Sequence, residues 1–263
     1  MKPVFGFGIA REEHFSLLPP MLPEEFSFLE VPGEILESRK ICADLERYST
    51  RQRKAVVIRD IVQSYLTDSA PFFPLHLKVE FDRKFRERCE AAARLKCRVI
   101  SAEFNLARAL GDPVYKKNLL NLLRSIAGIL DEFKFIMLLP LYFPADACSK
   151  SFTEFLNLKK ELFYPGFRFL LNYRFHEEGA GDMLNSVVSD LSFERNFWRL
   201  SYMPDTESLL QIEELENMRP LWENIPGNTP AYVCLEPGII APDQVMINDL
   251  AHLLKKYRSA GKE

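Results

Sequence analysis

Eight short apolar segments recur along this chain, and they constrain its fold more than any other feature. They begin about 20 to 45 residues apart, which suits parallel strands joined by helical crossovers and is too long for hairpins. This alternation predicts an α/β protein, a single (β/α)8 TIM barrel. The segments are VFGFGIA from Val4, FSFLEV from Phe26, AVVIRDIV from Ala55, RVISAEF from Arg98, KFIMLLPLYF from Lys134, FRFLLNYRF from Phe167, FWRLSYM from Phe197 and YVCLEP from Tyr232.

The length of the chain fits one such barrel. It has 263 residues, and these barrels typically take about 250. No internal repeat, linker or low-complexity tract divides the sequence, so we predict one domain over residues 1–263. The first crossover, REEHFSLLPPML, contains adjacent prolines, which predict a stunted first helix. A later helix should begin after Asp112, which precedes a proline suited to the first helical position.

Composition restricts the class of partner. The net charge of −3 and pI near 5.9 provide no basic field for a polyanion, so no nucleic-acid partner is expected. The 21 Phe residues are expected mainly between barrel and helices. Five cysteines, odd in number and without a CxxC pair, favour reduced thiols. The sequence shows no signal peptide and no apolar run near the ~20 residues of a membrane span. We therefore expect a cytoplasmic protein without a membrane partner.

Polar residues close several of the apolar segments. Glu30, Glu103, Asn172 and Glu236 occupy such positions, and TIM-barrel active sites lie at the carboxyl ends of the strands. Strand alternation places Glu30 on the same face as Phe28, and Glu236 on the same face as Cys234. If that face points inward, both glutamates lie at the barrel mouth.

The order of these segments resembles the xylose isomerase-like superfamily over essentially the whole chain. The resemblance rests on FLEVPGE, RCEAAARLKCRVISAEF and YVCLEPG in sequence. That superfamily includes sugar and sugar-phosphate isomerases, epimerases and the endonuclease four family. The resemblance implies a divalent metal held by a Glu on strand five, an Asp on strand six, a His or Gln around strand seven and a Glu on strand eight.

Only the last of these ligand positions is matched, by Glu236. Strand five has Leu139 and Pro140, strand six has Asn172, and strand seven has Arg199. An amide oxygen is a weaker ligand than a carboxylate, and an arginine repels a cation. We therefore expect no cofactor; a divalent site of the superfamily type, or a substitute site on Glu30, Glu103, His176 and Glu236, is the less favoured alternative.

The remaining polar residues supply candidates for chemistry. We predict Glu236, Glu30, Glu103 and His176 as catalytic residues, and Asn172, Arg174, Arg199 and Tyr202 as substrate-binding residues. Each role has an alternative. The glutamates could simply pair with Arg174 or Arg199, and His176 could be an exposed loop residue. His14 and His252 are expected on helix surfaces.

Two functions remain open. The first is a sugar or sugar-phosphate isomerase or epimerase acting on a small polyhydroxylated substrate. In it, Glu236 and either Glu30 or Glu103 transfer the proton while Arg199 or Arg174 stabilises an enediolate oxygen. The second is a barrel that has lost catalysis and binds a small ligand or a protein. A third function, a metal-dependent endonuclease, is disfavoured. It needs several metal-binding histidines and a basic face, whereas the chain has four His and a net negative charge.

Overall fold

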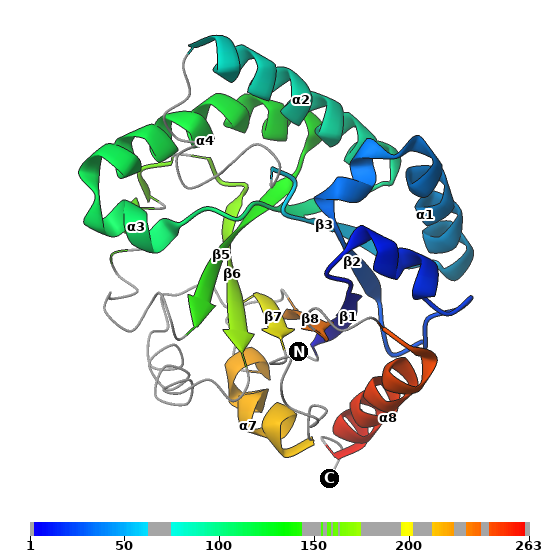
Figure 1. Ribbon diagram of the computed structural model, residues 1–263. Helices are drawn as coiled ribbons and strands as arrows, with labels where there is room; N and C mark the ends of the chain where they lie inside the picture. The colour runs from blue at the N-terminus through cyan, green and yellow to red at the C-terminus, as the bar shows by residue number, and fades with distance from the viewer. Residues whose placement is uncertain are drawn as a thin grey trace.

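The eight predicted strands form one closed barrel (Figure 1). The computed structural model describes residues 3–62, 75–143, 154, 157–158, 160–162, 164–174, 196–201, 212–223, 230–237 and 242–260. All strand pairs are parallel and follow chain order, and β8 closes on β1. The fold class is thus confirmed. The strands are β1 Val4–Gly8, β2 Phe28–Pro32, β3 Ala55–Arg59, β4 Val99–Ser101, β5 Ile136–Phe143, β6 Phe167–Arg174, β7 Phe197–Ser201 and β8 Tyr232–Glu236.

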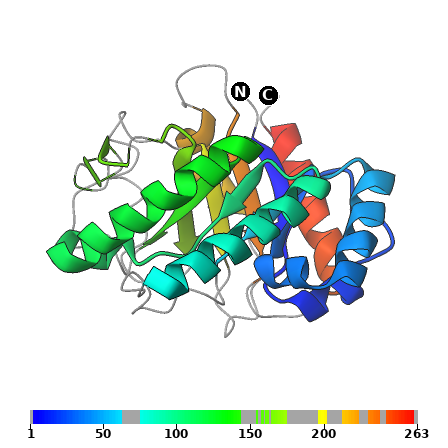
Figure 2. The ribbon, with the colours of Figure 1, turned by 90° about the horizontal axis from the view of Figure 1, so that it is seen from above.

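Helices surround the barrel on the outside (Figures 1 and 2). Within the described residues they are η1 Glu12–Leu17, η2 Gly33–Glu37, α1 Arg39–Gln52, α2 Leu75–Arg94, α3 Leu106–Gly111, α4 Pro113–Phe133, α7 Ile212–Glu223 and α8 Gln244–Ala260. Two predictions are confirmed. The first crossover carries only the short 3-10 helix η1, and Asp112 caps α4 by accepting hydrogen bonds from the backbone of Val114 and Tyr115. No helix of the described segments is long and apolar enough to cross a membrane.

Alternate residues of each strand face the helices and the barrel interior. Phe5 of β1 packs edge-on against Tyr257 of α8, with ring centroids 5.8 Å apart. Gly6 and Gly8 face inward instead, because a β-carbon built on either would meet interior side chains, those of Phe28 and Cys234 respectively. Several phenylalanines are buried between the strands and helices, as expected.

The register of β5 corrects one sequence-based alignment. Leu139 and Pro140 were expected at the ligand position of strand five, but β5 continues to Phe143, and Pro140 pairs with Leu170. The residue level with Asn172 is Tyr142. The extent of the segment was predicted correctly, but its register against strand six was not, because register depends on strand pairing, which the sequence of one strand does not give. The strand still contains no carboxylate.

Candidate functional site

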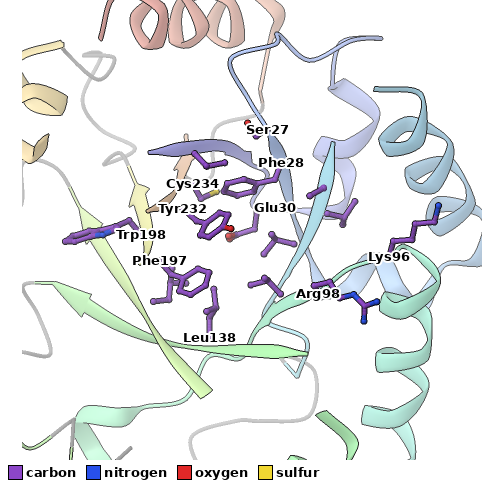
Figure 3. A pocket seen from close by; sticks show the side chains of 16 residues that line it. Ser27, Phe28, Glu30, Lys96, Arg98, Leu138, Phe197, Trp198, Tyr232 and Cys234 are labelled. Carbon is purple, nitrogen blue, oxygen red and sulfur yellow. The ribbon is translucent and has the colours of Figure 1, made fainter. Parts of the chain in front are cut away.

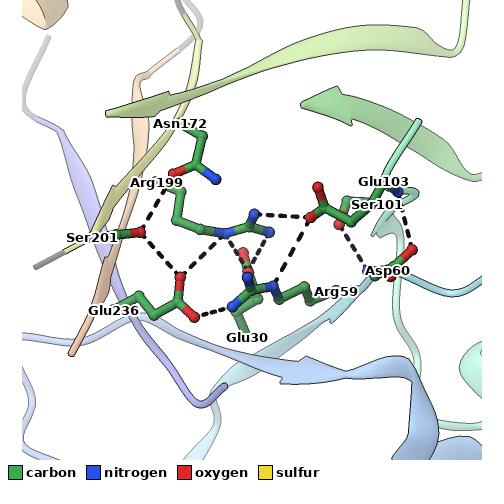
Figure 4. Close-up of polar contacts among 9 residues, drawn as sticks. All are labelled: Glu30, Arg59, Asp60, Ser101, Glu103, Asn172, Arg199, Ser201 and Glu236. Atoms are coloured by element: carbon green, nitrogen blue, oxygen red, sulfur yellow. Dashed lines mark hydrogen bonds and ion pairs between the residues drawn. The ribbon is translucent and has the colours of Figure 1, made fainter. Parts of the chain in front are cut away.

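Buried charged side chains meet inside the barrel at the carboxyl ends of its strands (Figure 4). We call this group the carboxyl-end cluster. Strand alternation explains its membership, since Arg199 and Ser201 share one face of β7 while Cys234 and Glu236 share one face of β8. Its members are Glu30, Arg59, Asp60, Ser101, Glu103, Asn172, Arg199, Ser201 and Glu236.

Arg199 is the centre of the cluster. Its guanidinium donates a hydrogen bond from Nε to Oε1 of Glu30 at 2.8 Å and from Nη1 to Oε1 of Glu103 at 3.3 Å. Its Nε also lies 3.9 Å from Oε2 of Glu236. The side chain is 0% exposed. Burial by itself lowers the pKa of Arg199, but Glu30 and Glu103 outweigh it and raise that pKa above its usual value.

Arg59 is a second cation, nearer the solvent. It forms an ion pair with Glu236 through Nη1, and its Nε lies 4.0 Å from Oε1 of Glu103. Burial and the adjacent Arg199 lower its pKa from the usual arginine value. The side chains of Arg59 and Glu103 are 24% and 22% exposed, whereas those of Glu30 and Glu236 are each 4% exposed. A ligand entering the mouth would therefore meet Arg59 and Glu103 first.

Asp60 is hydrogen-bonded to the backbone of Glu103. Its backbone N–H donates to the hydroxyl of Ser101, and its Oδ1 accepts a hydrogen bond from the backbone N–H of Glu103, both at 3.0 Å. Burial raises the pKa of Asp60 to about 6, although the hydrogen bond from Glu103 opposes that shift. Asp60 has φ of 46°, in the left-handed region that Asn and Asp tolerate better than most residues.

Two neutral side chains border the cluster on the side of β6 and β7. The hydroxyl oxygen of Ser201 lies 3.2 Å from Oε2 of Glu236 and 3.4 Å from Oδ1 of Asn172. Its single hydrogen can be donated to only one of these oxygens at a time. Ser201 and Asn172 therefore provide hydrogen-bonding groups next to Glu236.

The structure brings together five of the predicted site residues: Glu30, Glu103, Asn172, Arg199 and Glu236. The alternative for the glutamates, pairing with Arg199, is seen directly for Glu30. Arg174 ends β6, but its side chain lies outside the description, as do His176 and Tyr202 entirely. The roles assigned to these eight residues stay predictions.

Four members of the cluster were missed from the sequence: Arg59, Asp60, Ser101 and Ser201. The signal for the first two was present, because Arg and Asp interrupt the third apolar segment, AVVIRDIV, where β3 ends. Of the histidines, His252 is exposed as expected. His14 was expected on a helix surface and is instead 5% exposed. His14 is a buried residue of the short helix η1, so membership of a helix did not by itself place this side chain at the surface.

The carboxyl-end cluster does not fit a divalent-metal centre of the kind that the resemblance implies. Arg199 and Asn172 lie where ligands of β7 and β6 would be, and the guanidinium of Arg199 already holds the carboxylates of Glu30 and Glu103. In the described part of the chain, no three His, Cys, Asp or Glu side chains are arranged to hold a metal. A divalent ion placed here would have to displace Arg59 and Arg199, which already bind the carboxylates of Glu236, Glu30 and Glu103.

Comparisons with known proteins agree on the fold. No protein-family model matches the chain, and no curated protein matches it. Solved structures do match, and they share the fold seen here, a closed (β/α)8 TIM barrel.

Three of these structures illustrate the similarity. The 3-keto-D-glucoside 4-epimerase YcjR from E. coli is 14% identical, with a TM-score of 0.62 over 97% of this chain and 100% of that chain. D-psicose 3-epimerase, solved in the presence of D-fructose, is 11% identical, with a TM-score of 0.63 over 99% and 96%. A xylose isomerase domain protein from Planctomyces limnophilus is 12% identical, with a TM-score of 0.59 over 98% and 97%. At such low identity the likeness concerns the fold alone.

Proposed function

We propose that this barrel is an isomerase or epimerase acting on a small, neutral, polyhydroxylated substrate at the carboxyl-end cluster. One observation carries the proposal: Glu103 and Glu236 lie on either side of Arg59, at the end of the barrel where such enzymes react. The epimerases with the same fold support the sugar class.

Proton transfer at a carbon next to a carbonyl requires a base, an acid and a group that stabilises the developing oxyanion. Glu236 and Glu103 take the roles of base and acid. Arg59, the partly exposed cation between them, stabilises the enediolate oxygen. Asn172 and Ser201 hydrogen-bond substrate hydroxyls. Glu30 serves as the counter-ion of Arg199.

The charge of the cluster favours a neutral sugar over a sugar phosphate. Four carboxyl groups face two guanidinium groups, and each guanidinium is already paired with carboxylates. The partial protonation of Asp60 near neutral pH removes less than one negative charge. A phosphate brought into this field would be repelled by the excess of carboxylates.

Arg199 also fills the electrostatic role that a divalent ion would have. Its charge is fixed at the centre of the carboxylates, so it holds Glu30 and Glu103 in place without a metal. On this account, activity requires no added metal.

A barrel that binds the same sugar without reacting is the second candidate. The burial of Glu236 favours it, because only 4% of that side chain is exposed and it is already held by Arg59 and Ser201. The two candidates differ in whether carbon-bound hydrogen exchanges with solvent.

The test is proton exchange measured in D2O. The chain is incubated with neutral ketoses and with their phosphate esters, and deuterium incorporation at carbon is followed by NMR. We expect exchange with a neutral sugar, a loss of at least about 100-fold in Glu236→Gln and in Glu103→Gln, and unchanged exchange in Glu87→Gln, a control on the exposed face of α2. Exchange that survives Glu236→Gln would refute the assigned base. Sugar binding without any exchange would establish the second candidate.

A further inference from the structure

A cavity of about 380 Å³ opens at the other end of the barrel, where the strands begin. We call it the amino-end cavity. Phe28, Phe197 and Tyr232, which gather around its centre in Figure 3, are the first residues of β2, β7 and β8. Its volume falls in the range of small-molecule sites, about 300 to 1,000 Å³.

Small side chains explain why this level of the barrel is not filled. The interior of a TIM barrel is normally packed with layers of bulky side chains. Here β3 contributes Ala55 to the cavity wall, and β1 carries Gly6, over which the ring of Phe28 folds. The rings of Phe197 and Tyr232 stack nearly parallel, with centroids 5.4 Å apart, and 36% of Tyr232 is exposed. The cavity therefore presents a flat aromatic wall to solvent.

Charge at the two ends of the cavity orients any ligand. Glu30 lies at the inner end, where its carboxylate disfavours a second anion. Lys96 and Arg98 lie at one edge (Figure 3). Arg98 donates a hydrogen bond to the backbone carbonyl of Phe133 at 3.2 Å, and among the described residues neither cation forms an ion pair with a carboxylate.

We propose that the amino-end cavity binds a small organic acid, with its aromatic or aliphatic body inside and its anionic group at the edge beside Lys96 and Arg98. The aromatic wall supplies stacking and apolar burial, and the two edge cations supply attraction for one anion. This site is separate from the proposed reaction at the carboxyl-end cluster. The two regions share Glu30, which lines the cavity and holds Arg199 at 2.8 Å.

Two fluorescent probes with related ring systems test the proposal. 1-Anilinonaphthalene-8-sulfonate carries an anionic group, and N-phenyl-1-naphthylamine has the same rings without it. Titration of the full chain should show saturable binding of the sulfonate at one site per chain, and weaker binding of the neutral amine. Absence of saturable binding of either probe below about 1 mM, a value typical of weak ligands, would overturn the proposal.

Variants locate the probe. Ala55→Phe should reduce the affinity for both probes at least about tenfold by filling the cavity wall, whereas Val114→Phe, at an exposed position of α4, should leave both unchanged. Equal binding to Ala55→Phe and the unsubstituted chain would place the probe elsewhere and overturn the proposal.

The charge variants remain informative even if Ala55→Phe does not fold, because they leave the apolar and aromatic part of the cavity wall unchanged. Lys96→Gln combined with Arg98→Gln should weaken binding of the sulfonate about threefold or more and leave the amine unaffected. The matched control is Lys117→Gln, at an exposed position of α4. Equal weakening of both probes, or of neither, would contradict the role given to the edge cations.

Discussion

At the scale of single residues, the burial of Arg199 has the largest energetic consequence. A fully buried guanidinium is tolerated only because carboxylates surround it, and Glu30 in turn depends on Arg199 for its own compensation. Such a pair contributes little net stability compared with apolar packing, but removing one member leaves an uncompensated buried charge.

Arg199→Met should therefore destabilise the protein by about 3–5 kcal/mol. The loss should be smaller in the double variant Arg199→Met with Glu30→Gln, in which the buried carboxylate is also removed. The control Arg83→Gln breaks an exposed ion pair with Glu87 and should cost less than about 1 kcal/mol. Urea unfolding at neutral pH measures all three. An Arg199→Met variant as stable as the unsubstituted chain would show that the buried charge of Glu30 does not need Arg199 for compensation.

Asp60 should make stability depend on pH. Burial raises its pKa from 3.8 to about 6 in the folded state, so between these values the folded protein binds more protons than the unfolded chain. Stability from this group is present below about pH 4 and is lost as the pH rises to 6, by at most about 3 kcal/mol. Asp60→Asn keeps an acceptor for the N–H of Glu103 and tolerates a positive φ.

The comparison of urea unfolding between pH 4 and pH 7 isolates this effect. The stability of Asp60→Asn relative to the unsubstituted chain should increase as the pH rises through this range. A constant difference between the two proteins would mean that Asp60 does not titrate with a raised pKa.

The sequence predicted several residues of the site, and it raised the pairing of the glutamates with Arg199 as an alternative, but it did not indicate Arg59. Glu30 and Glu236 could be placed inside the barrel because strand alternation fixes the face of each side chain. The ion pair of Glu236 with Arg59 was not predicted, since these residues are 177 apart in the sequence. Such pairings depend on which strands are adjacent and at what register.

At the scale of elements, the contact between β1 and β2 depends on a missing side chain. Gly6 pairs in register with Phe28, and a β-carbon at Gly6 would lie 2.2 Å from the ring of Phe28. The ring occupies the space that any other residue would need. Both Gly6 and Phe28 thus shape the amino-end cavity as well as the strand pair.

Gly6→Ala should destabilise the protein by about 1–3 kcal/mol through overpacking. Combining it with Phe28→Leu should recover part of the loss. Gly128→Ala in α4 is the matched control: nothing lies within 4 Å of its added β-carbon, so it should stabilise the helix by about 0.5–1 kcal/mol. Thermal unfolding distinguishes the signs. A neutral Gly6→Ala would mean that the ring of Phe28 moves at no cost.

The order of elements was more predictable than their ends. Apolar periodicity and crossover length identified the barrel. The two prolines that follow η1 predicted that the first crossover would carry only a short helix. The fifth segment was predicted to its observed end at Phe143, but Leu139 and Pro140 were matched to the level that Tyr142 occupies, because register depends on pairing with β6.

At the scale of the whole molecule, barrel closure gathers residues that are far apart in sequence. β8 pairs with β1, so Glu236 near the carboxyl end of the chain lies beside Gly8 near its start. The same closure separates two environments along the barrel axis: charged side chains at the carboxyl ends of the strands, and an apolar, aromatic cavity at their amino ends. We assign the proposed reaction to the charged environment at the carboxyl ends.

The central claim is that Arg199 and Arg59 replace a divalent ion in the reaction of a neutral sugar. Its most direct test is the rate of deuterium incorporation at carbon before and after exhaustive treatment of the protein with a metal chelator. We predict the same rate in both samples, and no increase when Mn²⁺, Mg²⁺ or Zn²⁺ is added back. A rate abolished by the chelator and restored by one of these ions would contradict the claim.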